Sequence, residues 1–284
     1  MATNRQRYLR QQAELGGDEV YLTAPLPAGE PAVAEAVATE PAPVGSAQPE
    51  VPSAAATPAR SEPLASGIEK WRKDAPAIPG PGLVVQPPEV GLLGDEVWRT
   101  DSLDQLASMI HGCQKCRLCE GRTKAVPGEG NPRARLMCVG EGPGATEDQT
   151  GRPFVGAAGQ LLDQILAAID CPRDTVFIAN IVKCRPPQNR KPLPDEAAAC
   201  LPYLHRQIAL VRPTVLLALG GTAAEWLLGV RKSLGELRNQ VHRYGNIPLI
   251  VTYHPAALLR NPNWKKPTWD DVRIARQLLD PRSA

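Results

Sequence analysis

Four short apolar runs, none of which alternates apolar with polar residues, most strongly constrain the fold of this chain. They occupy residues 136–139, 176–182, 214–219 and 248–252. Stretches with helical spacing of apolar residues lie at 102–111, 156–169, 194–210, 221–228 and 269–279. Parallel strands covered by helices on both faces read as continuous apolar runs. We therefore predict a three-layer α/β/α fold with a central, mainly parallel four-stranded sheet.

Polar residues stand where three of these runs end. The first run leads into Gly140-Glu141-Gly142, whose glycines let the backbone approach a ligand closely. Asn180 lies near the end of the second run, and His254 follows the fourth. Because ligands of such folds gather at the carboxyl ends of the strands, we expect Glu141, Asn180 and His254 to converge on one site. The alternative is that each is an ordinary turn, cap or solvated residue.

The first third of the chain differs in composition from the rest. Residues 1–100 hold 14 of the 30 prolines, and they carry 8 basic and 13 acidic residues. They show neither helical nor strand periodicity, apart from isolated apolar anchors at Trp71 and Trp98. We therefore expect residues 1–94 to be a disordered Pro/Ala-rich arm and linker, and residues 95–284 to be one folded domain. A protein partner is one role open to the arm.

Charge and cysteine content indicate the surroundings of the folded domain. Residues 101–284 carry 24 basic and 17 acidic residues, an excess that favours a polyanionic partner, although a solvated enzyme surface explains it equally well. The chain shows neither a signal-peptide pattern nor a long apolar span, so we expect a cytoplasmic monomer with no membrane partner. In a reducing compartment, its seven cysteines indicate metal or redox chemistry rather than disulfides.

Four of the cysteines are spaced as metal ligands. Cys113 and Cys116 form a close C-x-x-C pair, Cys184 follows the second predicted strand, and Cys200 lies in the next predicted helix. If the fold brings the two pairs together, they suit either tetrahedral zinc or an iron-sulfur cluster. The spacing leaves both metals open, and Cys119 competes for the place of fourth ligand.

Five segments in a fixed order resemble a known family. They are CQKCRLCEGRTKAVPGEG, VGEGPGATEDQTGRPFVGAAGQLLDQIL, IANIVKCRPPQNRKPLPDEAAAC, VLLALGGTAA and VTYHPAALLRNP. Over residues 111–279 the chain is similar to the iron-sulfur, or family four, uracil-DNA glycosylases. The resemblance implies a monofunctional, base-flipping DNA-repair hydrolase. Such an enzyme cleaves the N-glycosidic bond of deoxyuridine in single- or double-stranded DNA, leaves an abasic site, and works at the nucleoid.

The resemblance also implies roles for individual residues in the cluster and the base pocket. Cys113, Cys116, Cys184 and Cys200 would hold a 4Fe-4S cluster, with Cys119 beside it as a non-ligand. Phe154 would stack on the flipped uracil, and Asn180 would hydrogen-bond its polar edge. His254 would donate to the uracil oxygen that becomes negative. Glu141, together with the neighbouring backbone at Gly142, would position the attacking water.

The segment that follows His254 resembles the family's DNA-insertion loop. Leu258 and Leu259 would fill the gap that a flipped base leaves, and Arg260 would contact phosphate. The alternative for the two leucines is a helix start that packs into the core. Arg185 and Arg190 would make further phosphate contacts.

A different class of function remains open at this point, namely a non-catalytic, metal-stapled nucleic-acid-binding accessory module. The sequence leaves open which damaged bases beyond uracil are processed.

Overall fold

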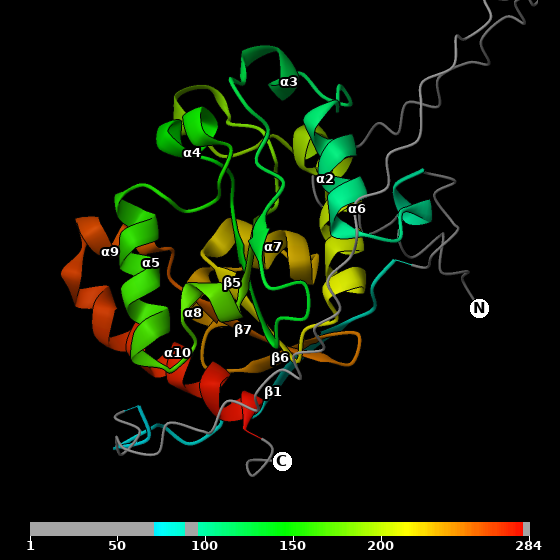
Figure 1. Ribbon diagram of the computed structural model, residues 1–284. Helices are drawn as coiled ribbons and strands as arrows, with labels where there is room; N and C mark the ends of the chain where they lie inside the picture. The colour runs from blue at the N-terminus through cyan, green and yellow to red at the C-terminus, as the bar shows by residue number, and fades with distance from the viewer. Residues whose placement is uncertain (1–70, 89–95, 281–284) are drawn as a thin grey trace, which may run out of the picture. The chain divides into compact units, whose positions relative to one another are not determined.

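The strands of the described chain form one sheet. The computed structural model describes residues 71–88 and 96–280 (Figure 1). Across the sheet the strands run in the order β1-β6-β7-β5-β3-β4-β2. In chain order they are β1 (Pro81–Val85), β2 (Glu129–Gly130), β3 (Leu136–Gly140), β4 (Phe177–Asn180), β5 (Val215–Leu219), β6 (Val241–Tyr244) and β7 (Ile247–Thr252).

The centre of the sheet consists of the four strands predicted from the sequence. β3 pairs in parallel with β4 and with β5, and β5 pairs in parallel with β7. All four therefore end at the same edge. In the register of β3 and β4, Gly140 stands opposite Asn180, which places the Gly140-Glu141-Gly142 turn beside that amide.

The prediction of a four-stranded sheet is wrong, because the sheet has seven strands in the described residues. β2 is two residues long, too short to show a period, and it pairs antiparallel with β4. β6 is four residues long, contains the adjacent polar residues His242 and Arg243, and forms an antiparallel hairpin with β7. The α/β class and the mainly parallel sheet centre are confirmed.

Part of the segment predicted to be a linker is a strand, β1. Residues 81–85 pair in parallel with β6 at the edge of the sheet, where a proline is tolerated because one side of the strand needs no partner. Trp71, predicted to be an apolar anchor, is buried, and its indole N–H donates to Asp170 at 2.9 Å. Residues 1–70 lie outside the described chain, so the predicted disordered arm stays a prediction.

Helices cover both faces of the sheet (Figure 1). They are α2 (Leu103–His111), α3 (Leu118–Gly121), α4 (Ala145–Thr150), α5 (Ala157–Ala168), α6 (Pro194–Val211), α7 (Gly221–Leu228), α8 (Leu234–Leu237), α9 (Pro255–Arg260) and α10 (Lys265–Leu279). The described residues also contain four 3-10 turns: η1 (Glu96–Arg99), η2 (Arg173–Thr175), η3 (Pro187–Asn189) and η4 (Pro262–Trp264). No helix in residues 71–88 and 96–280 combines the length and apolar character needed to cross a bilayer.

Alternate residues of the central strands belong to two hydrophobic clusters, one on each face of the sheet. Met137 and Val139 of β3 pack with α2, α6 and α7 on one face. Leu136 and Cys138 of the same strand pack with α5 and α10 on the other. The three-layer arrangement follows from this period of two, because each central strand is apolar on both faces.

One half-buried histidine, His205, makes the stability of this fold sensitive to acid. Burial lowers the pKa of His205 to about 4, and its Nδ1 lies 2.6 Å from the Tyr244 hydroxyl. Between pH 6.5 and 4 the unfolded chain therefore binds more protons than the folded one, so stability rises with pH. We expect the free energy of unfolding to be about 1–2 kcal/mol lower at pH 5 than at pH 7 from His205 alone.

Urea denaturation of the wild type and His205→Gln at both pH values measures this contribution. The variant should depend less steeply on pH. Equal pH dependence of the two proteins would show that His205 is not responsible.

Candidate active site

A cleft of about 380 Å³ opens at the carboxyl ends of the central strands. It is lined by all five residues predicted for the base pocket and by two of the predicted DNA-binding arginines: Glu141, Gly142, Phe154, Asn180, His254, Arg190 and Arg260. They come from the ends of β3, β4 and β7 and from the loops and helices next to them. The expected convergence of Glu141, Asn180 and His254 is therefore observed.

Phe154 and Asn180 meet over the last residue of β3. A Cβ atom placed on Gly140 would lie 2.5 Å from Asn180 Oδ1 and 2.5 Å from Phe154 Cζ. Any side chain at Gly140 would therefore displace both groups. The Phe154 ring also lies against His254, with ring centroids 5.4 Å apart. The floor of the cleft thus combines an aromatic face, an amide and an imidazole.

Asn180 carries an unsatisfied acceptor. Its side chain is 1% exposed, and its Oδ1 atom is buried without a hydrogen-bond partner among the described residues. Its backbone carbonyl accepts from Lys183 Nζ at 2.8 Å, so the main chain is fixed while the side-chain oxygen is not used. A buried oxygen without a partner costs free energy, which a ligand N–H in the cleft would recover.

His254 is held in one tautomer. It is the N-cap residue of α9, and its Nδ1 accepts the Ala256 backbone N–H at 3.2 Å. The neutral ring therefore carries its proton on Nε2. Removal from water, aided by the nearby Arg260 charge, lowers the pKa of His254 to about 4. At neutral pH the site thus contains an uncharged imidazole that can donate from Nε2.

Glu141 is fixed at the tip of the strand. Its Oε2 accepts from the Thr222 hydroxyl at 2.5 Å, and its carbonyl accepts the Val182 N–H at 3.1 Å. Thr222 lies in the first turn of α7 and was not predicted from the sequence. The second carboxylate oxygen forms no hydrogen bond with a described residue, and Glu141 lines the cleft, which suits a group that orients a water molecule.

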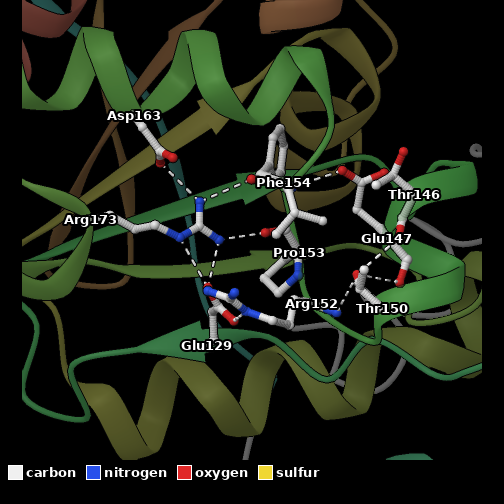
Figure 2. A network of polar contacts seen from close by, with 10 residues as sticks. Glu129, Thr146, Glu147, Thr150, Arg152, Pro153, Phe154, Asp163 and Arg173 are labelled. Carbon is white, nitrogen blue, oxygen red and sulfur yellow. Dashed lines mark hydrogen bonds and ion pairs between the residues drawn. The ribbon is translucent and has the colours of Figure 1, made fainter.

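Arg173 holds the segment that carries Phe154 (Figure 2). Its guanidinium donates to the carbonyls of Phe154 at 3.0 Å and Pro153 at 2.5 Å. The same group donates to Glu129 at 2.7 Å and to Asp163 at 2.9 Å. It therefore ties two backbone oxygens of the loop to two carboxylates from elsewhere in the fold.

The Phe154 loop needs this support because its backbone is strained. Phe154 has a φ of 51°, in the left-handed region that bulky residues avoid. From the other side, one oxygen of Glu147 accepts the N–H groups of Val155 and Gly156, both at 2.9 Å. Gly159 of α5 has no Cβ, and a Cβ there would lie 1.9 Å from the Phe154 carbonyl oxygen. Arg173, Glu147 and Gly159 together fix the ring in the cleft.

The predicted DNA-insertion residues separate into two classes. Leu258 is 1% exposed and packs in the interior, so its prediction as an inserting residue is corrected to a core role. Leu259, the next residue of α9, is 50% exposed. Consecutive helical residues point about 100° apart, so only one of two adjacent leucines can face the core. Of the two leucines, only Leu259 is exposed at the surface, as insertion into DNA requires.

The predicted phosphate-binding arginines also differ in what they contact. Arg260 is exposed at the rim of the cleft. Arg190 lines the cleft and forms an ion pair with the buried Glu196 at 2.6 Å. Arg185 donates to the side chain of Asn189 at 2.8 Å. Arg190 and Arg185 therefore share their donors with the protein.

The cysteines predicted to bind metal line one small hollow beside α2 and α6, together with the rival ligand: Cys113, Cys116, Cys184, Cys200 and Cys119. Within residues 71–88 and 96–280, no three His, Cys, Asp or Glu side chains are arranged so that they could hold a single metal ion. Burial raises the pKa of the Cys184 and Cys200 thiols. Both sulfurs accept hydrogen bonds, from Arg122 at 3.0 Å and from the Lys183 backbone N–H at 3.3 Å.

Comparison with known proteins shows which sequences this chain resembles. The sequence model of the Uracil DNA glycosylase superfamily matches residues 127–275. The type-4 uracil-DNA glycosylase of Sulfurisphaera tokodaii is 46% identical over 187 residues, which cover 63% of this chain and 85% of that protein. The type-4 enzyme of Thermotoga maritima is 44% identical over 185 residues, covering 64% and 96%. The type-5 uracil-DNA glycosylase of Thermus thermophilus is 36% identical over 151 residues, covering 46% and 68%.

Proposed function

The chain belongs to the type-4 uracil-DNA glycosylases of the uracil-DNA glycosylase superfamily, and on this premise we propose that it removes uracil from single- and double-stranded DNA by hydrolysing the N-glycosidic bond. The observation that carries the proposal is the unsatisfied, buried Oδ1 of Asn180 in a cleft that Phe154 and His254 also line. A site that only bound the DNA backbone would not need these three groups around a space of base size.

Recognition of the base follows from the amide. A base inside a duplex is out of reach, so the nucleotide must be flipped out, at a cost of a few kcal/mol. Stacking on Phe154 recovers about 1–3 kcal/mol of this. Asn180 Oδ1 would accept uracil N3–H, and its NH₂ would donate to O4. Cytosine offers the opposite pattern at these atoms, and burying mismatched polar groups is strongly unfavourable.

Bond cleavage would use the imidazole and the carboxylate. As the bond between C1′ and N1 breaks, the electron pair moves into the uracil ring and negative charge grows on O2. A donor already in place there, His254 Nε2–H, stabilises this charge without rearrangement. Glu141, fixed by Thr222, would orient the water that adds to C1′. No residue in this scheme forms a covalent intermediate with the sugar, so an abasic site is the expected product.

The cysteine site suits a structural metal centre. We propose that Cys113, Cys116, Cys184 and Cys200 hold a 4Fe-4S cluster, with a zinc ion as the alternative. The donor set fits, because four thiols from two distant segments line one hollow and two of the sulfurs accept N–H groups. The buried Lys183 ammonium, near Cys200 and without a carboxylate partner among the described residues, also favours an anionic centre. When bound, the cluster would fasten the loop after α2 to α6.

Metal analysis of cysteine variants tests this assignment. The purified protein should show visible absorption that bleaches on reduction, and it should contain about four irons per chain. Cys184→Ser should lose most of the iron and melt at a lower temperature. Cys119→Ser, the matched control in the same hollow, should keep both the iron and the melting temperature. A colourless protein that contains zinc would select the alternative, and loss of iron in Cys119→Ser would change the ligand set.

An excision assay tests the function directly. A labelled oligonucleotide with one uracil, single-stranded or paired with guanine or adenine, should be cleaved by alkali after incubation with the protein. Matched thymine and cytosine oligonucleotides should stay intact. Binding to DNA without excision would instead support the non-catalytic accessory module. We further propose that the protein acts as a monomer on nucleoid DNA and that the N-terminal arm binds a protein partner.

A further inference from the structure

A stack of three side chains stands beside the cleft without a role in the mechanism. The rings of Tyr253 and Trp264 lie 4.9 Å apart at an interplanar angle of 6°. The guanidinium of Arg238 covers the Tyr253 ring at 4.7 Å. Arg238 in turn donates to the buried Asp271 at 2.7 and 3.0 Å, and Asp271 also accepts from Thr252. The stack is therefore anchored in the core.

The stack is joined to the active site through α9. Tyr253 directly precedes His254, the N-cap residue of that helix. At the other end of α9, Asn261 N donates to the Ala257 carbonyl and Trp264 N donates to the Asn261 carbonyl. Trp264 thus ends the segment that begins at the catalytic imidazole. α9 itself has six residues and is about 9 Å long, or about three stacked nucleotides.

The outer side of this segment is basic and partly apolar. Trp264 is 36% exposed and Leu259 is 50% exposed. Arg260, Lys265 and Lys266 are exposed as well, and none of the three forms an ion pair with a described residue. The sequence from 255 to 269 contains no Asp or Glu. Charges on an ordinary solvated surface are usually of mixed sign, and here the charged side chains of residues 255–269 are all positive.

We propose that Leu259, Arg260, Trp264, Lys265 and Lys266 form a binding surface for the DNA strand next to the flipped nucleotide. Trp264 stacks on an unpaired base of that strand, and the lysines contact its phosphates. Aromatic residues bind bases without sequence preference because every base has a π-face, and paired bases inside a duplex do not offer that face. The surface therefore favours single-stranded substrate. This inference rests on the proposed function and adds a second contact region to it.

Binding of an oligonucleotide without uracil tests the surface apart from catalysis. With a labelled single-stranded oligonucleotide of about twenty nucleotides, Trp264→Ala should raise Kd about tenfold or more, as expected for one stacked base, and Trp264→Phe should recover most of the loss. Replacing Lys265 and Lys266 by alanine should lower the slope of log Kd against log salt by about 1.4. Lys232→Ala, an exposed lysine elsewhere, is the matched control and should change neither.

Kinetics on two substrates add the link to the active site. With a long single-stranded uracil oligonucleotide, Trp264→Ala should raise KM with kcat unchanged. With a substrate that has one nucleotide on each side of the uracil, it should match the wild type. Equal Kd values for wild type and Trp264→Ala, or an equal KM change on both substrates, would overturn the proposal. Binding that depends on Trp264 in a protein that removes no uracil would refute the proposed function and leave the surface in place.

Discussion

Replacing His254 with alanine should lower kcat for uracil release about 10²–10³-fold and change KM for DNA little. The expected size is that of losing one donor placed in advance where charge develops. The neutral ring donates from Nε2, because Nδ1 already accepts the Ala256 N–H. Single-turnover excision from a uracil oligonucleotide measures the effect. Wild-type kcat in a well-folded His254→Ala would remove His254 from the mechanism.

The matched control for this prediction separates catalysis from helix capping. His254 caps α9, so alanine also removes a cap worth about 1 kcal/mol. Asparagine is a good N-cap residue, yet its shorter side chain does not reach as far as Nε2. His254→Asn should therefore keep the thermal stability and lose as much activity as His254→Ala. Recovery of activity in His254→Asn would mean that the cap matters and the donor does not.

The lowered pKa of His254 allows its role as a neutral donor to be tested in the wild-type protein. Since the pKa lies at about 4, the imidazole stays neutral through the range in which an ordinary histidine titrates. The rate of the chemical step should therefore show no ionisation near pH 6.5. It should fall only as the pH approaches 4, where protonation removes the acceptor that Ala256 needs. An inflection near pH 6.5 that disappears in His254→Asn would contradict this assignment.

The sequence predicted the sheet centre because burial on both faces leaves a continuous apolar run, as in Leu136–Gly140 of β3. It did not predict the edges. β1 becomes a strand by pairing with β6, which lies far along the chain, through contacts such as the Leu83 N–H with His242 Nδ1 at 3.0 Å. β6 is only four residues long and is held between β1 and β7. Pairing with a distant strand leaves only a weak apolar pattern in the local sequence, and the glycines and prolines around β1 suggested a linker.

The residues of the site also divide into those that the sequence predicted and those that it did not. Glu141, Asn180 and His254 were predictable because the fold class itself brings strand ends together. Thr222 and Arg173 were not, since each acts through one contact across the fold, with Glu141 and with the Phe154 loop respectively. The phase of α9 decided between the adjacent leucines, and only the packed structure gives that phase.

Arg173 is expected to matter nearly as much as the residues that contact the base. Arg173→Ala would leave the carbonyl oxygens of Pro153 and Phe154 without this donor, and Glu129 would keep only its ion pair with Arg152 (Figure 2). Phe154 could then relax from its left-handed conformation, because φ near 51° costs about 1–3 kcal/mol and needs support. We expect kcat/KM to fall tenfold or more and inhibition by free uracil to weaken, with only a modest loss of thermal stability.

A double-mutant cycle distinguishes this positioning role from a general loss of stability. If Arg173 acts through the Phe154 ring, then Arg173→Ala should have little further effect on kcat/KM once Phe154 is alanine. Arg173→Lys should recover little activity, because a single ammonium nitrogen lacks the planar fork of separate N–H groups with which the guanidinium binds both carbonyls and Glu129. Asp163→Ala, which removes a half-exposed partner of the same guanidinium, should keep most activity. Losses in Arg173→Ala and Phe154→Ala that simply add would mean that Arg173 supports the fold and not the stacking face.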